Sequence, residues 1–465
     1  MLNINPDDTI AALATPPGTG AIAVVRISGK QTFSLTDGLF LSRTGKRLEI
    51  GSRPSHSIVF CIINDEEPID EVLVSVFKGP NTFTGEDTLE ISCHGSTFVQ
   101  QRILDLLSKR GIRMAQPGEF TMRAFLHGKM DLSQAEAVAD LIASDTVASH
   151  RLALNQLRGG FSDEIKALRQ ELVQFASLIE LELDFAEEDV EFASRNQLKQ
   201  SVQRLQEKIR RLIRSFEVGN VIRNGIPVVI AGKPNAGKST LLNALLNDDR
   251  AIVSDIPGTT RDTVEEEIKL GGIRFRFIDT AGIRETTDAI EKIGVEKTME
   301  KIRQSPIIIY LFDVNETSCG ELKLEIERLR NEIDPSFIIL PVGNKIDQQD
   351  TDLLEKEFSG VPDTLLISAK SATNLDNLTS ILLRHTNAQK LQSGDTIVTS
   401  ARHVEELRKT DSWLEKVIQG MERNTTNDFL AGDLRFALHH LGNITGEISN
   451  DELLENIFSK FCIGK

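Results

Sequence analysis

The spacing of hydrophobic and polar residues changes along the chain and divides its first half into two parts. Residues 1–118 contain short apolar runs at 21–28, 55–63, 70–77 and 88–95, together with a helical pattern over 96–111. Turn sequences rich in glycine and proline separate these runs. Short β-like runs around one strong helix predict a small N-terminal α/β domain.

Residues 119–222 instead carry the pattern of long helices. In the stretch 161–185 the apolar residues recur at helical spacing: Ile165, Leu168, Leu172, Phe175 and Ile179. Such a stripe predicts a helix with one buried face. Upstream, Ser133 followed three residues later by Glu136 predicts a capping box at a helix start. We therefore expect the first part of an all-α domain here.

Residues 223–383 return to strands alternating with helices. The runs at 226–232, 274–280, 307–314, 337–344 and 364–370 are almost continuously apolar. Runs of this kind are typical of strands buried on both faces of a mostly parallel sheet. Residues 384–465 are helical again but too few for an independent core. We expect them to complete the helical domain, with a Ras-like α/β P-loop GTPase domain inserted within it.

Composition narrows the class of protein. The 465 residues carry a formal net charge of -16, which argues against a protein that coats nucleic acid through its whole surface. The four cysteines are scattered without metal-binding spacing, and they predict a reducing compartment. No run approaches the roughly 20 apolar residues of a membrane span, and residues 1–18 have no signal-peptide pattern. A cytoplasmic location without membrane contact is the expectation.

The strongest local pattern is G-x-x-x-x-G-K-S at residues 232–239, between a predicted strand and a predicted helix. Glycines there allow backbone N–H groups and the helix N-terminus to surround phosphates. Lys238 would add a charge at the β and γ oxygens, and Ser239 would bind magnesium. A bare match can also be an ordinary glycine-rich turn, so the other motifs decide between the two interpretations.

Four further motifs follow in order. Gly258 to Asp262 contains Thr260, the expected magnesium-binding switch threonine, and residues 279–282 read Asp-Thr-Ala-Gly after an apolar strand. Residues 344–347 read Asn-Lys-Ile-Asp, and the Asp347 carboxylate can accept two hydrogen bonds from the guanine edge. Ser368-Ala369-Lys370 would support the base. The ordered set predicts GTP binding.

The residue that activates water is less clear from these motifs. Ile283 stands where Ras-like enzymes place a glutamine. The acidic candidates downstream are Glu285, Asp288 and Glu291, each of which could equally be a solvated carboxylate. No arginine finger can be recognised, and a metal cation held by the oxygen-rich stretch 254–260 together with Asn235 could supply the positive charge.

The whole chain resembles the MnmE (TrmE) family of tRNA-modification GTPases. The resemblance is carried by the GTPase motifs together with 14–29 (ATPPGTGAIAVVRISG), 79–95 (GPNTFTGEDTLEISCHG), 117–142 (PGEFTMRAFLHGKMDLSQAEAVADLI) and 461–465 (FCIGK). It implies an N-terminal domain that dimerises and binds a formyl-tetrahydrofolate derivative, a helical domain and an inserted G domain. It also implies potassium-licensed pairing of G domains.

The resemblance further implies site residues. It assigns catalysis to Glu291 and potassium to Asn235, Ser254, Ile256 and Thr259, and it adds these to the roles that the motifs give: Lys238 and Thr260 in catalysis, and Ser239 and Thr260 on magnesium. Folate is assigned to Arg26, Glu90, Lys129 and Lys465, although Arg26 and Glu90 taken alone could be surface-facing strand residues. Cys462 is a weak site candidate. With the motifs, the GTP-binding set is Asn235, Ala236, Gly237, Lys238, Ser239, Thr240, Ser254, Asp255, Ile256, Pro257, Gly258, Thr259, Thr260, Asp279, Thr280, Ala281, Gly282, Asn344, Lys345, Asp347, Ser368, Ala369 and Lys370.

The implied function is a potassium-dependent GTPase that works on tRNA with a flavin-dependent partner, MnmG (GidA). Together they would add a (carboxymethyl)aminomethyl group at C5 of the wobble uridine. A ribosome-assembly GTPase that binds RNA without modifying it would share the same five motifs, so it is the alternative. The absence of a recognisable RNA-binding signature and the presence of the folate-type N-terminal segment favour the first interpretation.

Overall fold

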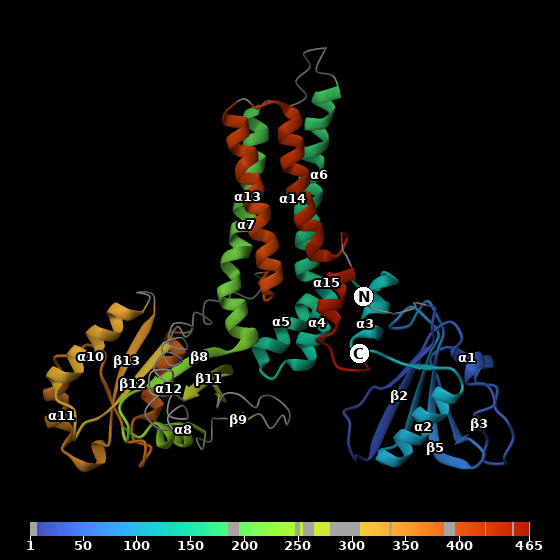
Figure 1. The fold of residues 1–465 in the computed structure, drawn as a ribbon, viewed down its shortest axis with the longest axis horizontal. Helices are drawn as coiled ribbons and strands as arrows, with labels where there is room; N and C mark the ends of the chain where they lie inside the picture. Colours follow the sequence, from blue (N-terminus) through green and yellow to red (C-terminus); the bar gives the residue numbers. More distant parts are fainter. Residues whose placement is uncertain are drawn as a thin grey trace, which may run out of the picture. The chain divides into compact units, whose positions relative to one another are not determined.

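The computed structural model describes residues 7–184, 195–246, 252–253, 265–279, 307–333, 337–385, 396–423, 425–448 and 451–464. The chain divides into two compact units. One unit comprises Met1–Ala143, Ala153–Ile209 and Glu406–Lys465, and the other comprises Ser144–Leu152 and Arg210–Glu405. An N-terminal α/β part, a helical part and a second α/β part are present, which confirms the predicted fold class (Figure 1). The four domain boundaries given above stay predictions.

The first sheet belongs to the N-terminal part. Its strands are β1 (Ile10–Leu13), β2 (Ile22–Ser28), β3 (Phe40–Leu41), β4 (Ser57–Asn64), β5 (Pro68–Phe77), β6 (Thr88–His94) and β7 (Arg113–Met114). They lie in the order β3-β4-β5-β6-β2-β1-β7, and all neighbours are antiparallel except β1 and β7. The four longest were predicted. The short strands β1, β3 and β7 were not, because runs of two to four residues carry little periodic signal.

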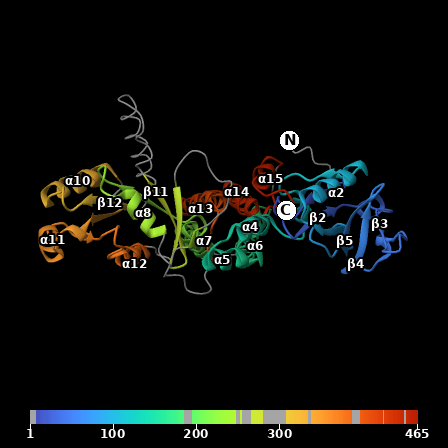
Figure 2. The same ribbon diagram turned by 90° about the horizontal axis from the view of Figure 1, so that it is seen from below.

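Helix α2 (Thr97–Lys109) covers one face of this sheet (Figures 1 and 2). Its Ile103, Leu106 and Leu107 are buried in one core cluster with alternate residues of the central strands, such as Val25 and Ile91. Two further short elements, α1 (Thr32–Leu35) and η1 (Ile50–Ser52), lie in the connection between β2 and β4. Alternation along each strand therefore leaves the other face of the sheet for polar or ligand-binding residues.

The helical part is drawn from two distant regions of the sequence. The first region supplies α3 (Glu119–Leu126), α4 (Leu132–Ala143), α5 (Val147–Leu157), α6 (Gly160–Asp184) and α7 (Arg195–Asn224), and the second supplies α13 (Ala401–Glu422), α14 (Asn427–Thr445) and α15 (Asp451–Phe458). Helix α14 packs along α6 and contacts α4 (Figure 1). The five residues of the predicted apolar stripe are all buried in α6. Helix α14, from the C-terminal region, therefore packs against helices of the first region.

The predicted capping box at Ser133 and Glu136 is wrong by two residues. The Asp131 carboxylate accepts a hydrogen bond from the Gln134 backbone N–H at 3.0 Å, and the Gln134 side chain accepts one from the Asp131 N–H at 2.9 Å. Asp131 and Gln134 form the reciprocal cap. Ser133 is buried and bonds to Ser162 across to α6, because it lies inside the first turn.

The second sheet has the order β14-β13-β12-β8-β11-β10-β9. Its strands are β8 (Ile226–Ala231), β9 (Ile252–Val253), β10 (Glu265–Leu270), β11 (Ile273–Asp279), β12 (Ile307–Asp313), β13 (Ile338–Asn344) and β14 (Leu365–Leu366). The five predicted runs form the parallel part, and every residue of β12 is buried. The antiparallel β10 was not predicted because its sequence, EEEIKL, is mostly charged.

Helices cover both faces of this second sheet. Helices α8 (Lys238–Leu246) and α12 (Leu375–His385) pack into one core cluster, and α10 (Cys319–Glu332) and α11 (Thr351–Phe358) pack into another. Connection η4 (Ile346–Gln348) follows β13. Because every strand of the parallel part contributes to a core on each side, the loops at the strand ends are held in fixed register.

The inserted domain leaves and rejoins the helices at a close crossing. Helix α7 leads into β8, and the returning segment 396–400 passes over α7 at Gly219. The Ser215 hydroxyl accepts a hydrogen bond from the Val398 backbone N–H at 3.1 Å. A Cβ at Gly219 would lie 2.0 Å from the Val398 carbonyl oxygen. Only glycine fits between α7 and the returning segment at this point.

Replacing this glycine should destabilise the inserted domain and its attachment. We expect Gly219→Ala to lower the free energy of unfolding by about 1–3 kcal/mol, because the new methyl group overlaps backbone that cannot turn away. Gly432 of α14 is the matched control, since a Cβ there meets nothing within 4 Å. Gly432→Ala should raise stability by roughly 0.5–1 kcal/mol through better helix propensity. Denaturant unfolding of both variants measures the two effects; equal changes would contradict the crossing.

Candidate functional site

The turn 232–237 connects the end of β8 to the start of α8, as the P-loop pattern requires. Gly232 and Gly237 have φ of 147° and 96°, conformations that favour glycine. A Cβ at Gly232 would lie 2.0 Å from the Leu311 carbonyl oxygen of the neighbouring strand β12. One at Gly237 would lie 2.4 Å from the Asn344 amide nitrogen. The two glycines allow this turn to lie against the sheet with its backbone directed to a ligand.

The Lys238 ammonium group lies against the backbone of the P-loop turn 232–237. Its side chain is 8% exposed, and its Nζ donates to the carbonyl oxygens of Gly232 at 2.9 Å and Lys233 at 3.1 Å. An ammonium held at the N-terminus of a helix, above a ring of backbone groups, fits the phosphates of a nucleotide. Ser239 and Thr240 are exposed on the first turn of α8. A hydroxyl there is in place for a magnesium ion on those phosphates.

Asn344 joins three of the predicted motifs. It ends β13, is buried, and its Nδ2 donates to the Ala236 carbonyl oxygen in the P-loop at 2.9 Å. Its Oδ1 accepts from the Ala369 backbone N–H at 2.9 Å. The asparagine of the base motif thus acts as a brace between the phosphate loop and the loop 368–370, so base and phosphates would be read by one connected structure.

Asp347 is held by the same loop. Its Oδ1 accepts a hydrogen bond from the Ser368 hydroxyl at 2.7 Å, and that hydroxyl in turn accepts from the Ser371 N–H. The Lys345 backbone adopts a left-handed conformation with φ of 72°. Lys370 is exposed beside these residues. The Asp347 carboxylate is acceptor-only, which suits it to the donors of a guanine edge.

Asp313 is a site residue that the sequence reasoning missed. It ends β12 and accepts from the Lys345 Nζ at 2.6 Å. Burial raises the pKa of Asp313, but the Lys345 ammonium and two hydrogen bonds from Asn315 outweigh it and hold the pKa below its usual value. The available signal was its position at the end of a buried strand, as for Asp279 and Asn344. It fixes the Lys345 side chain along the base-binding loop.

The rest of the predicted nucleotide site can be placed only in part. Asp279 ends β11, where its backbone pairs in register with Ile230 of β8, next to the P-loop. The remaining predicted residues lie outside the described residues: Ser254, Asp255, Ile256, Pro257, Gly258, Thr259, Thr260, Thr280, Ala281, Gly282, Glu291 and, in the N-terminal site, Lys465. Asn235, predicted to bind potassium, is exposed in the P-loop with φ of 64°.

A second group of predicted residues meets on the first sheet. Arg26 of β2 and Glu90 of β6 are direct cross-strand partners, joined by a salt bridge of 2.8 Å. The Arg26 guanidinium also lies 5.8 Å from the ring centroids of Phe83 and Phe120, and it donates to the Gly464 carbonyl oxygen at 3.5 Å. The arginine and the glutamate offer hydrogen-bond donors and acceptors beside aromatic rings, groups that suit a planar ligand with polar edges.

Lys129 lies next to the turn 83–87, which carries Phe83. A Cβ at Gly85 would be 3.5 Å from the Lys129 Cε and 3.0 Å from the His127 Cβ, so the turn carrying Phe83 passes directly over these side chains. The Lys129 side chain is exposed. Cys462 is an exposed free cysteine in the C-terminal segment, where its carbonyl oxygen accepts from Gly118. Its role stays a prediction.

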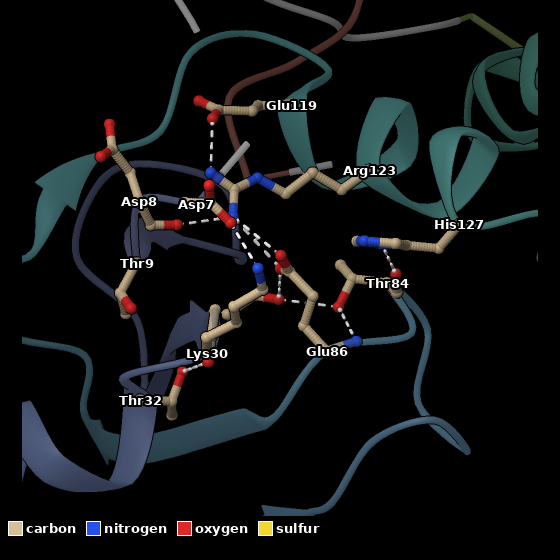
Figure 3. Close-up of polar contacts among 12 residues, drawn as sticks. Asp7, Asp8, Thr9, Lys30, Thr32, Thr84, Glu86, Glu119, Arg123 and His127 are labelled. Atoms are coloured by element: carbon tan, nitrogen blue, oxygen red, sulfur yellow. Dashed lines mark hydrogen bonds and ion pairs between the residues drawn. The ribbon is translucent and has the colours of Figure 1, made fainter. Parts of the chain in front are cut away.

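A buried ionic network supports this site (Figure 3). Arg123 of α3 is 1% exposed, and it donates to Glu86 at 3.1 Å, to Glu119 at 3.1 Å and to the Asp8 carbonyl oxygen at 2.7 Å. Burial raises the pKa of Glu119, but a second arginine, Arg113, together with backbone N–H and Arg123, lowers it below its usual value. Glu86 also accepts from Ser28 at 2.8 Å.

This network involves two of the sequence stretches that carry the resemblance. Glu86 lies in 79–95 and Arg123 in 117–142, and neither residue was assigned a role from the sequence. In the fold they form one buried ion pair that holds the turn 83–87 against α3. Its members were not recognisable beforehand, because only the tertiary structure brings residues 37 positions apart together.

Helices cover both faces of a mainly parallel sheet, and its P-loop is hydrogen-bonded to a loop of the kind that recognises guanine. These features define the class of P-loop G-domain proteins. A family model described as the MnmE helical domain matches residues 132–462, and one described as the GTP-binding protein TrmE N-terminus matches residues 9–129. The chain belongs to the MnmE family of tRNA modification GTPases, as the resemblance predicted.

Full-length relatives agree with this assignment. The tRNA modification GTPase MnmE of Flavobacterium psychrophilum is 54% identical over 461 residues, which cover 98% of this chain and 99% of the relative. That of Cytophaga hutchinsonii is 54% identical over 462 residues, covering 99% of this chain and 98% of the relative. Among solved structures, Aquifex aeolicus Era bound to GDP.AlF4- has 28% identity over 40% of this chain and 66% of that chain, with a TM-score of 0.27. The assignment rests on the family models and relatives alone.

Among the helices that the structure describes, none combines the length and the apolar character that crossing a bilayer requires.

Replacing the Asp347 carboxylate by an amide should change which base is bound. Because an amide presents a donor where guanine also presents one, we expect Asp347→Asn to weaken GTP binding by about 1–3 kcal/mol, the cost of leaving a donor of the bound base without an acceptor. Xanthosine triphosphate, which carries an oxygen at that edge, should bind the variant better than GTP. Competition binding with both nucleotides measures the preference. An unchanged preference for GTP would contradict the role of Asp347.

Removing the Arg123 charge should destabilise the N-terminal part strongly. Arg123→Met leaves the Glu86 and Glu119 carboxylates buried without their shared cation, and we expect a loss of about 3–5 kcal/mol in unfolding free energy. Arg47, which pairs with Asp37 on the exposed surface, is the matched control. Arg47→Met should change stability by less than about 1 kcal/mol. Similar losses in both variants, measured by denaturant unfolding, would show that burial of the Arg123 network does not matter.

Proposed function

We propose that this protein hydrolyses GTP to GDP and phosphate with the help of potassium. With a flavin-dependent partner of the MnmG (GidA) kind, it adds a (carboxymethyl)aminomethyl group at C5 of the wobble uridine of tRNA. The observation that carries the proposal is the Asn344 brace, which connects the phosphate loop to the base loop within a chain of the MnmE family. Asp347 and Lys238 supply the base and phosphate recognition on either side of that brace.

The residues around the phosphates support the proposed roles. Lys238 would bind the β and γ oxygens, and Ser239 and Thr260 would hold magnesium, which neutralises the charge that develops on those oxygens. Asn235, with Ser254, Ile256 and Thr259, would hold potassium where other GTPases use an arginine. The exposed left-handed Asn235 presents a hard oxygen ligand from within the P-loop itself. Glu291 would then orient the attacking water.

The open face of the first sheet supports both the folate site and dimerisation. Arg26 and Glu90 lie on this face, and so do three exposed apolar side chains of β4 and β5: Ile58 at 68%, Phe60 at 44% and Leu73 at 46% exposure. Exposed apolar side chains grouped on one sheet face are typical of an interaction surface. We propose that two chains pair through this N-terminal part and that the formyl-tetrahydrofolate derivative binds beside Arg26, Glu90, Lys129 and Lys465.

The remaining partners follow from the family and the composition. We propose that the tRNA and the flavoprotein act on this chain in the cytoplasm, where its scattered cysteines stay reduced. G domains of two chains would pair in the presence of potassium, since the residues proposed to hold the cation include Asn235 of the phosphate loop. The chain itself needs no membrane for this function.

Potassium dependence is the direct test. We expect GTP hydrolysis in potassium buffer to exceed that in sodium buffer of equal ionic strength by on the order of tenfold or more, because the cation replaces an arginine at the transition state. Glu291→Ala should lose this hydrolysis while GTP still binds. Glu285→Ala and Asp288→Ala are the matched controls, as the other acidic candidates of the same segment, and both should retain activity.

The outcomes separate the parts of the proposal. Equal rates in the two salts would contradict the potassium mechanism, and loss of activity in Glu285→Ala but not in Glu291→Ala would reassign the water-orienting residue. Release of phosphate is measured under single-turnover conditions, so that product release does not mask the chemical step.

A further inference from the structure

Two cations face each other at the tip of the β10–β11 hairpin. Lys269 and Arg274 are direct partners in the antiparallel register, next to the turn at Gly271 and Gly272. Their side chains are 15% and 16% exposed. Like charges directly opposite one another destabilise a strand pair, and partial burial makes the repulsion stronger. Something must compensate these charges for the hairpin to keep its register.

Asp145 supplies this compensation. It lies between α4 and α5, in the segment Ser144–Leu152 that clusters with the inserted domain in one compact unit. Its Oδ1 accepts from the Arg274 guanidinium at 2.5 Å and its Oδ2 from the Lys269 Nζ at 3.2 Å. The carboxylate is itself only 16% exposed. Glu267, at 3.6 Å from Arg274, is a weaker second partner.

A second helix end reaches the same hairpin. Gly225, the residue between α7 and β8, has φ of 74°, and a Cβ there would lie 3.0 Å from the Arg274 carbonyl oxygen and 3.2 Å from its Cβ. Arg274 therefore contacts both Asp145, in the segment just before α5, and Gly225, the residue just after α7. Both helices continue into the other compact unit, which contains residues 153–157 of α5 and residues 195–209 of α7.

The β10–β11 hairpin lies in the sequence between two of the predicted GTPase motifs. Residue 265 of β10 closely follows the motif 258–262, which contains the predicted switch threonine, and β11 ends at Asp279, the first residue of the DTAG motif. The hairpin thus joins the two segments that are expected to respond to the γ-phosphate. A displacement of the hairpin relative to β8 would move the end of β11 at the phosphate site.

We infer that Asp145 is a positioning residue for GTP hydrolysis: through Lys269 and Arg274 it holds the β10–β11 hairpin against the ends of α5 and α7. It thereby couples the nucleotide site to helices of the bundle. This role requires neither tRNA nor the flavoprotein partner, and it rests on GTP hydrolysis as proposed above. It predicts that the hydrolysis step, rather than nucleotide affinity, depends on a charge far along the chain from every GTPase motif.

The test uses the full-length chain with Asp145→Asn, which keeps the shape and removes the charge. We expect kcat for GTP hydrolysis to fall about three- to tenfold, in the range of coupling effects at a distance, with KM and GDP affinity changed less than about twofold. The charge-swapped double variant Asp145→Arg with Arg274→Glu re-forms the pair and should recover most of kcat. Glu180→Gln, which breaks the exposed pair with Arg435 in the helical bundle, is the matched control and should leave kcat unchanged.

Each outcome decides the inference. A normal kcat in Asp145→Asn, or no recovery in the double variant, would overturn it. A parallel loss of GDP affinity and thermal stability in Asp145→Asn would also overturn it, because the contact would then be needed for folding alone. The comparison of potassium and sodium uses the unaltered chain, so a failure there concerns the proposed function and is distinguishable from a failure of the Asp145 role.

Discussion

The buried Arg123 guanidinium is the contact on which the N-terminal half of the structure depends. Taking a charge out of water is costly, and Arg123 compensates that cost only by meeting Glu86, Glu119 and the Asp8 carbonyl together. These groups come from the start of β1, the turn before β6 and helix α3. Once they are joined, α3 is placed against the sheet, and Gly118 at its start can receive the backbone of Phe458 and Cys462 from the C-terminal segment. The C-terminal residues then reach Arg26 through the Gly464 carbonyl.

The nucleotide module depends on a different constraint, the close approach of backbone to backbone. Gly232 and Gly237 permit the phosphate loop to lie against β12 and Asn344 at distances that no side chain would allow. Asn344 then uses both ends of its amide, one for the phosphate loop and one for the base loop. The predicted base and phosphate loops are therefore hydrogen-bonded into one set of strand ends, and Asp313 adds to it by holding Lys345.

The inserted domain is attached through more than its two covalent connections. The return segment crosses α7 at Gly219, Gly225 abuts Arg274, and Asp145 ties the β10–β11 hairpin to the start of α5. Each contact lies within the unit that contains the second sheet. A hairpin held in this way would transmit a change at the nucleotide to these helix ends more directly than a flexible linker would, because close-packed backbone and partly buried ion pairs resist displacement.

The sequence by itself determined the local features and the family. Apolar runs predicted the five parallel strands and the buried stripe of α6, and the ordered GTPase motifs predicted a nucleotide site whose described residues do lie together at the strand ends. These are properties of spacing along the chain, which periodicity reports directly. Weak signals failed: β10 is mostly charged, β1, β3 and β7 are very short, and the cap of α4 is Asp131 rather than Ser133. Only the tertiary structure decided that Arg123 pairs with Glu86, that Asp313 holds Lys345, and that Asp145 lies against Lys269 and Arg274. Those partners are between 32 and 129 positions apart. The sequence around a charged residue does not show which distant residue of opposite charge will lie against it in the fold.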